Sequence, residues 1–232
     1  DKENPVKSGI PIADLGAGLY AVIGILSAIQ SREKNDSGEH VDISMLDTQV
    51  SLLTYMATMH FLSGENPEPI GNQHMNHVPF NSYRTSDGFI QIGVVAEDFW
   101  PSLIEALDLR QLNTEENKVR SGRLKNRENI DRAVQEVFIT NTTEHWLKTL
   151  QEHRVPCGPI NSLSETFQDA DLLKRNMIVE VLQDSGASVK MPGNPVKISN
   201  HDEEFRRSPK LGEHTSEIFK DWLNKDISVD KD

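Results

Sequence analysis

The longest apolar stretch of the chain lies near its start, between the charged residues Lys7 and Arg32. Asp14 is the only charged residue in this interval, and almost every position after it is apolar or small. A segment that is apolar on all sides is typical of a helix buried inside a protein. The pattern therefore predicts a buried helix from Asp14 to about Lys34, followed by the turn residues Asn35-Asp-Ser-Gly38.

Asp14 stands at the predicted start of this helix. Aspartate is a preferred N-cap residue, and the positive end of the helix dipole favours a carboxylate there. Gly16 and Gly18 have no side chains and would let another group approach the backbone beside Asp14. Two interpretations stay open from these residues alone, a cap that only starts the helix or a reactive carboxylate. A membrane span over Ile10 to Ile29 has a suitable length, but Asp14 and three glycines interrupt it.

The next elements complete a helix–strand–helix unit. Polar and apolar residues alternate over Glu39 to Ser44, which predicts a short strand. Apolar residues then recur near helical spacing over Met45 to Leu62, which predicts a second long helix that ends at Gly64. A strand needs partners, so this unit cannot be a free-standing fold.

A linker composition at Glu65 to Gly71 separates this unit from the rest of the chain. Asp87-Gly88 lies between two β-rich runs and predicts a hairpin that ends near Val95. Amphipathic patterns predict helices at Asp98 to Leu109, Arg127 to Phe138, Thr143 to His153, Leu163 to Asn176 and about Ser216 to Asn224. Extended segments are predicted at Val155 to Ile160, Ile178 to Leu182, Ser188 to Met191 and Pro195 to Ile198. The second half is therefore of α+β type.

Composition limits the possible partners. The 232 residues suffice for one large domain or two small ones, and the net charge of −12 opposes binding to nucleic acid. One basic stretch, Lys118 to Arg132, also holds acidic residues and no aromatic ones, so we interpret it as a solvated helix face or loop. The chain starts with Asp and reaches an apolar helix within about ten residues, which indicates a piece of a longer protein.

Two segments contain residue types that serve metal or thiol chemistry. The single cysteine, Cys157, fits a reducing, cytoplasmic compartment, and with no histidine beside it we interpret it as a packed structural thiol. His74 and His77 lie in a segment bounded by Gly71 and Pro79, which indicates a loop without further ligands, so no metal site is predicted.

Several sequence blocks together resemble the family III CoA-transferases, a group that includes formyl-CoA and carnitine CoA-transferases and the α-methylacyl-CoA racemases. The blocks occur in the same order as in that family and extend over nearly the whole chain. They are Ile12 to Leu19, Gly38 to Asp47, Gly71 to His74 with Pro79-Phe80, Thr85 to Gly88 with Ile90 to Ile92, Val155 to Pro159, and Leu211 to Thr215. The resemblance covers only the second part of a family member.

The resemblance implies an α/β plus α+β architecture in an interlocked homodimer. Residues 1–64 would be the end of a large Rossmann-like CoA-binding domain, and residues 65–80 a linker and active-site loop. Residues 81–190 would form a small α+β domain, and residues 191–232 a C-terminal return segment and helix. The nucleotide end of coenzyme A would be held mainly by a region upstream of Asp1, and this part alone would be inactive.

The resemblance also implies a function. Asp14 matches the aspartate that acts as the nucleophile of the transferases, which move coenzyme A between carboxylic acids through an aspartyl anhydride and an aspartyl-CoA thioester. In the racemases the same aspartate belongs to an acid/base pair. The implied partners are an acyl-CoA and a small carboxylic acid, with no permanently bound cofactor, metal, nucleic acid or membrane. A non-catalytic binding fragment, in which Asp14 only caps a helix, is the other alternative.

Two departures from the family pattern concern specificity. The formyl-CoA transferases have a run of glycines before the hairpin, whereas this chain has Gly71-Asn-Gln-His-Met-Asn-His77. This puts formyl-CoA and oxalate specificity in doubt and makes Gly71, Asn72 and His74 candidates for substrate contact; the alternative is a hydrogen-bonded structural loop. The racemases carry a glutamate shortly after the hairpin, where this chain has Ala96 with Glu97 beside it.

Overall fold

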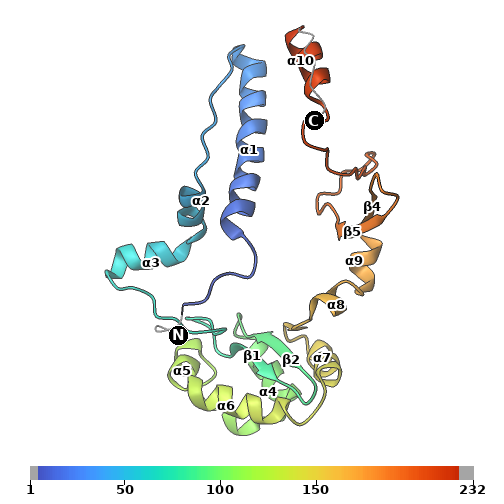
Figure 1. Cartoon of the computed structure of the whole chain (residues 1–232). Coiled ribbons are helices and arrows are strands. Elements are labelled where there is room, and N and C mark those ends of the chain that lie inside the picture. The colour runs from blue at the N-terminus through green and yellow to red at the C-terminus, as the bar shows by residue number, and fades with distance from the viewer. Residues whose placement is uncertain (1–4, 225–232) are drawn as a thin grey trace. The chain divides into compact units, whose positions relative to one another are not determined.

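The computed structural model describes residues 5–224 of the chain as a mixed α/β protein with small sheets (Figure 1). It divides into two compact units, residues 1–158 and residues 159–232. The first unit contains two parts of different character. An α-helical part comes first, and a small sheet covered by helices follows it along the chain.

The helical part consists of α1 (Ile12–Asn35), α2 (Met45–Leu52) and α3 (Tyr55–Ser63), and α1 and α2 lie side by side (Figure 1). The predicted first helix is confirmed, but it starts at Ile12 with Pro11 as the N-cap residue. The interpretation of Asp14 as the cap is therefore wrong, because this residue belongs to the first helical turn.

The burial predicted for this helix is also wrong within the described residues. Only Gly16 of α1 is buried, because α2 covers a narrow strip of a helix that is apolar all round. Large apolar side chains on the remaining surface are exposed, among them Ile12, Leu15, Leu19, Val22, Ile23 and Leu26. With a mean hydropathy of 1.9, α1 also meets the length and composition of a membrane span, a test that core helices of soluble proteins pass as well.

Two further predictions for this part are corrected. Residues 39–44 form no strand, because no neighbouring strand among the described residues pairs with them. The segment Met45 to Leu62 is not one helix, because the backbone breaks at Leu53 and Thr54, where Thr54 has a φ of 49°. Gly64 ends α3 with a φ of 75°, as predicted from its type.

The sheet consists of β1 (Phe80–Arg84), β2 (Phe89–Gly93) and β3 (Cys157–Pro159) in the order β1-β2-β3. Strands β1 and β2 are antiparallel with Arg84 opposite Phe89, which confirms the predicted hairpin. Asp87 in its turn accepts hydrogen bonds from the backbone N–H (2.8 Å) and the hydroxyl (2.9 Å) of Thr143. The turn is thereby attached to the start of the following helix layer.

The helices of this part are α4 (Phe99–Ala106), a 3-10 turn η1 (Arg110–Leu112), α5 (Arg120–Lys125), α6 (Arg127–Phe138) and α7 (Thr143–Glu152). The predictions of α4, α6 and α7 are confirmed, whereas η1 and α5 were not predicted. Their apolar faces bury one core with the sheet, which includes Ile90, Ile92, Trp100, Leu103, Ile130, Val134, Phe138 and Leu150. Gln135 of α6 exchanges two hydrogen bonds with the backbone of Arg84 at the edge strand β1.

The second unit contains α8 (Leu163–Thr166), α9 (Ala170–Lys174), the antiparallel hairpin of β4 (Ile178–Leu182) and β5 (Ser188–Pro192), and α10 (Thr215–Leu223). The helix predicted over Leu163 to Asn176 is divided, because Asp169 caps a new helix by accepting from the N–H groups of Asp171 and Leu172. The strands β4 and β5 are confirmed, and residues 195–198 are not in a strand.

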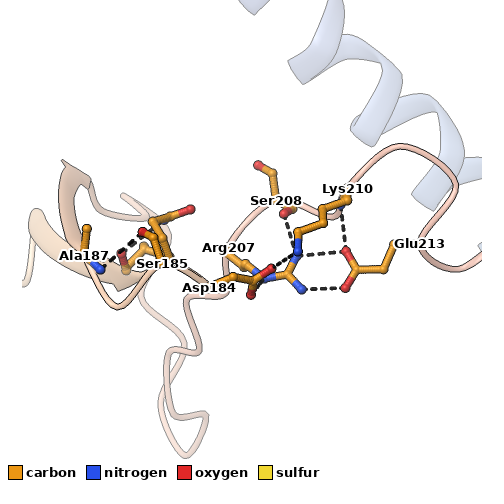
Figure 2. Close-up of polar contacts among 9 residues, drawn as sticks. Asp184, Ser185, Ala187, Arg207, Ser208, Lys210 and Glu213 are labelled. Carbon is orange, nitrogen blue, oxygen red and sulfur yellow. Dashed lines mark hydrogen bonds and ion pairs between the residues drawn. The ribbon is translucent and has the colours of Figure 1, made fainter. Parts of the chain in front are cut away.

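An ion cluster holds the turn before α10 (Figure 2). The guanidinium of Arg207 donates to both carboxylate oxygens of Glu213, at 2.8 Å and 2.5 Å. Arg207 also pairs with Asp184, which lies between β4 and β5, and Lys210 Nζ lies 2.7 Å from the same carboxylate. Leu211 to Thr215 is one of the sequence blocks on which the family resemblance rests. These contacts attach it to the β4–β5 hairpin of the same unit.

Candidate functional site

Asp14 lies on the first turn of α1 with an exposed side chain. The N–H groups at the start of a helix lack intrahelical partners and point along the axis toward its N-terminal end. Together with the helix dipole they stabilise negative charge at this end of α1. The position therefore suits a carboxylate that must be reachable by a reactant.

The two glycines after Asp14 have different roles. A β-carbon on Gly16 would lie 2.8 Å from Cγ2 of Thr48 on α2, so the missing side chain allows the two helices to pack. A β-carbon on Gly18 would have no described atom within 4 Å. The predicted open approach to the backbone thus applies to Gly18, whereas Gly16 is filled by the neighbouring helix.

The three candidates for substrate contact lie together in the irregular segment between α3 and β1. Gly71 has a φ of 62°, a conformation that favours glycine. The side-chain amide of Asn72 donates to the hydroxyl of Ser82 at 2.6 Å. The ring of His74 stacks on Tyr55 with centroids 6.5 Å apart and meets the ring of Phe80 at 5.2 Å. This segment is therefore a structured loop, in which the side chains of Asn72 and His74 already have partners within the chain.

His77 completes the aromatic cluster of the loop. Its ring centroid lies 4.6 Å from that of His74, and its Nδ1 atom is buried with no hydrogen-bond partner among the described residues. Burial and the positive charges of His74, Arg120 and Arg123 lower the pKa of His77. Within the described part of the chain, no three His, Cys, Asp or Glu side chains gather as a metal site would require.

The loop and Asp14 are not joined in this structure. Among the described residues, no hydrogen bond or ion pair connects Asp14 with Gly71, Asn72 or His74. The candidates thus form two groups, a carboxylate on α1 and a polar loop that begins after α3. No hydrogen bond or ion pair among the described residues brings these two groups of candidates together.

Arg123 was not identified from the sequence, and the interpretation of Lys118 to Arg132 as a solvated face is wrong at this position. The side chain is 1% exposed in this structure and lies over the ring of Trp100. It donates to the carbonyl oxygens of Val78, Asn117 and Lys118 and to the carboxylate of Glu97. A charged residue within a basic stretch gives no local sign of such burial, because two of its acceptors, Val78 and Glu97, come from distant segments.

Glu97 is committed to the same network. Its Oε2 accepts from Arg123 at 2.7 Å, and its Oε1 accepts from the backbone N–H of Arg120 at 3.0 Å. Partial burial would raise the pKa of Glu97, but these hydrogen bonds outweigh it and hold the pKa below its ordinary value. A carboxylate of this kind is a poor proton donor near neutral pH.

Cys157 occupies β3 and packs half-buried against the core. Burial raises the pKa of its thiol, which disfavours the reactive thiolate. The geometry supports the interpretation of this residue as a structural thiol. Asp14 thus remains the reactive candidate among the residues that the sequence patterns suggested.

Comparison with known proteins assigns the chain to a family. The sequence model described as CoA-transferase family III matches residues 1–215, which include Asp14, the loop and the turn before α10. The chain belongs to this family. The residues matched by the family model include parts of both compact units.

Individual family III proteins agree with this assignment. The chain is 28% identical over 225 residues to the succinyl-CoA:glutarate CoA-transferase of Homo sapiens, with 96% of this chain and 51% of that protein aligned. It is 32% identical over 218 residues to the succinyl-CoA:mesaconate CoA-transferase of Haloarcula marismortui, covering 93% and 54%. Among solved structures, a CAIB/BAIF family protein from Brucella suis matches 93% of this chain and 56% of its own with a TM-score of 0.76 and 30% identity. The chain therefore spans about half the length of these relatives.

Proposed function

We propose that the full-length protein transfers coenzyme A between carboxylic acids, with Asp14 as the nucleophile. The observation that carries this proposal is the exposed carboxylate of Asp14 on the first turn of α1, inside a segment matched by the CoA-transferase family III model. The relatives named above are CoA-transferases, which supports the same reaction class.

The reaction would proceed in four steps. The Asp14 carboxylate attacks the thioester carbonyl of the donor acyl-CoA, which forms a mixed anhydride and releases the CoA thiolate. The thiolate attacks the aspartyl carbonyl, which forms an aspartyl-CoA thioester and releases the donor carboxylate. The acceptor carboxylate then attacks the aspartyl carbonyl, which forms a second mixed anhydride, now with the acceptor, and releases the thiolate again. The thiolate finally attacks the acceptor carbonyl, which yields the new acyl-CoA and regenerates Asp14.

The position of Asp14 suits these steps. Each tetrahedral intermediate carries an oxyanion, and N–H groups at the start of a helix are donors of the required kind. Water must be kept away, since both the anhydride and the thioester hydrolyse. We assign this role to the loop from Gly71 to His77, with Asn72 and His74 as the side chains that meet the substrate.

The alternative of an acyl-CoA racemase receives less support. A racemase of this superfamily would need a glutamate near Ala96. The adjacent Glu97 has both carboxylate oxygens occupied by donors from Arg123 and Arg120, and its pKa is lowered. It therefore fits a structural ion pair better than a proton-transferring group.

The complete protein would have the organisation of the family. Residues 1–64 would finish a large Rossmann-like CoA-binding domain whose remainder lies upstream, followed by the loop region 65–80, a small domain of residues 81–190 and a return segment of residues 191–232. Two such chains would interlock as a cytoplasmic homodimer. The exposed apolar side chains of α1 and α3 support this view, because uncovered surface of this size needs a partner. The 232 residues alone would be inactive.

The names of two relatives support a proposal for the acids that are exchanged. Succinyl-CoA with glutarate and succinyl-CoA with mesaconate are the pairs in the names of the human and haloarchaeal proteins. We therefore propose succinyl-CoA as the donor and a short dicarboxylic acid as the acceptor. A panel of acids offered to the full-length protein with succinyl-CoA measures this directly.

The nucleophile is tested by trapping. Full-length protein is incubated with succinyl-CoA without acceptor, treated with hydroxylamine and mapped by mass spectrometry. We expect a hydroxamate at Asp14, loss of transfer in Asp14→Asn, and full transfer in the matched control Asp36→Asn, which changes the left-handed C-cap of the same helix. Near-normal turnover of Asp14→Asn would refute the mechanism. A wild-type full-length protein that transfers no coenzyme A and forms no hydroxamate would favour the non-catalytic alternative.

A further inference from the structure

The loop from Gly71 to His77 has little support from its own backbone. Within these residues the described backbone makes a single hydrogen bond to another backbone group, from Gln73 N–H to Ile70 O at 3.3 Å. Backbone groups outside helices and sheets need other partners if a segment is to keep one conformation. The shape of this loop therefore depends on side chains that reach it from other elements.

These side chains come from α5 and α6 at a regular spacing of four residues. Arg127 and Asp131 contact His74 and Gln73 of the loop, and Arg123 contacts Val78, the residue that follows it. The contacts are Arg123 Nε to Val78 O at 2.9 Å, Arg127 Nη2 to His74 O at 2.7 Å, and Gln73 Nε2 to Asp131 Oδ2 at 3.3 Å. The loop is thus attached to α6 at two adjacent residues, His74 and Gln73, and Arg123 of α5 holds the residue after it.

The attachment is itself anchored in the core. Asp131 accepts a second hydrogen bond on Oδ1 from the hydroxyl of Tyr83, at 2.5 Å. Tyr83 lies on β1 and is 2% exposed. Asn72 is held on the same strand through Ser82. The position of Gln73 is therefore set by Asp131, which is itself bonded to a buried residue of the sheet.

Arg127 provides the strongest single contact of this set. A hydrogen bond from a charged guanidinium to a carbonyl is stronger than one between neutral groups. Arg127 Nη2 lies at 2.7 Å from His74 O and at 3.4 Å from Met75 O, so one amino group spans the middle of the loop. Removing it would free the loop at the residue whose ring faces Tyr55, His77 and Phe80.

We propose that Arg127 and Asp131 are positioning residues for the transfer reaction, which act by holding the loop from Gly71 to His77 in one conformation. They do not touch the substrate; they place Asn72 and His74, which do. This inference rests on the proposed function for the role of the loop. The contacts that hold the loop are independent of that function.

The test uses the full-length protein with the variants Arg127→Met, Arg127→Lys and Asp131→Asn. Arg132→Gln is the matched control, because Arg132 is an exposed arginine on the same helix that makes no hydrogen bond to the loop among the described residues. The readouts are hydrogen exchange of residues 72–77, KM and kcat for the acceptor acid, the ratio of thioester hydrolysis to transfer, and Tm.

For Arg127→Met we expect exchange in the loop and the KM for the acceptor acid each to rise about tenfold, the effect of one lost charge-assisted hydrogen bond. Hydrolysis should increase relative to transfer, while exchange in β2 stays unchanged. Arg127→Lys should recover part of the KM, because an ammonium can still reach one carbonyl. Asp131→Asn should shift the same readouts in the same direction. This variant tests the inference if Arg127→Met does not fold.

Arg127→Met and Asp131→Asn with KM and hydrolysis ratio within about twofold of wild type would overturn the inference, since a lost charged hydrogen bond should exceed that effect. Faster exchange of the loop without any change in the kinetics would also overturn it. The two residues would then hold the loop, but the conformation of the loop would not matter for catalysis. A wild-type protein that moves no coenzyme A refutes the proposed function first, and the exchange data still decide whether the arginine holds the loop.

Discussion

Gly16 of α1 lies against Thr48 of α2 so closely that a β-carbon added to Gly16 would stand 2.8 Å from Cγ2 of the threonine. Both residues are buried, in a part of the chain where most side chains are exposed. Thr48 is held in place by its own hydrogen bond to the carbonyl of Ser44 at 2.9 Å. The glycine therefore determines how near α2 approaches the helix that carries Asp14.

Gly16→Ala is expected to separate α1 from α2. The added methyl group meets a short, fixed side chain, so we expect a loss of about 1–3 kcal/mol in unfolding free energy, typical of overpacking. Gly18→Ala is the matched control, because its β-carbon would meet no described atom and alanine favours a helix by about 1 kcal/mol over glycine. Chemical unfolding of both full-length variants measures the difference. A Gly16→Ala variant with the same unfolding free energy as Gly18→Ala would contradict this packing role of Gly16.

Arg123→Met is expected to destabilise the small sheet and its helices strongly. The change keeps much of the side-chain length but leaves the buried carbonyls of Val78, Asn117 and Lys118 without this donor. We expect a loss of about 3 kcal/mol or more, because several hydrogen bonds to one charge are removed together. Unfolding followed by tryptophan fluorescence is a suitable measurement, since the guanidinium lies 5.3 Å from the centre of the Trp100 ring.

Glu97→Gln provides the comparison for this network and for the racemase alternative. Glutamine can still accept from Arg123, and the Glu97 side chain is largely exposed, so the loss of unfolding free energy should stay at about 1 kcal/mol. Transfer activity should be retained. A variant that folds normally but loses catalysis would contradict the structural role given to Glu97.

The Arg207–Glu213 pair is expected to give the second unit a dependence on acid pH. Hydrogen bonds from Arg207 lower the pKa of Glu213 from 4.5 to about 2. The folded state thus favours the ionised form, so this contribution to stability is present above pH 4.5 and is lost as the pH falls toward 2. Glu213→Gln lacks it at every pH. The difference between wild type and this variant should therefore be largest near neutral pH and shrink as the pH falls below 4.5.

Hydrogen exchange of residues 208–216 in the full-length protein measures this difference, because Glu213 and Lys210 hold that turn (Figure 2). Glu217→Gln removes the same charge from α10 and serves as the control. A gap between wild type and Glu213→Gln that persists unchanged at about pH 2 would show that the ion pair is not its cause.

The full-length protein is expected to be an obligate homodimer. The exposed apolar surface of α1, α2 and α3, with residues such as Leu26, Leu46 and Phe61, is too large for a soluble monomer without cover. We expect an interface above about 2,000 Å², the range of obligate dimers. Sedimentation at sub-micromolar concentration measures the assembly, and a stable, active monomer would be the contrary result.

The sequence alone determined the elements whose signals are local. The bounds of α6 were predicted as Arg127 to Phe138 and observed there, because a strong amphipathic pattern depends only on neighbouring residues. The hairpin followed from Asp87-Gly88 for the same reason. Asp14 was predicted as the nucleophile through a motif of adjacent residues that resembles the family, and the family match includes this motif, while the role of Asp14 stays a prediction. What these predictions share is that no distant segment is needed to make them.

Tertiary structure decided where distant segments meet. Arg123 is buried because its acceptors include the carbonyl of Val78, 45 positions away, and nothing in a basic stretch indicates such a partner. The loop around His74 is held by a hydrogen bond from Arg127, which lies 53 positions away in the sequence. Similarly, an all-apolar pattern predicted a buried α1, whereas burial depends on surfaces that the described residues do not supply. A pattern reports what a segment can bury, and only the packed chain decides which partner covers it.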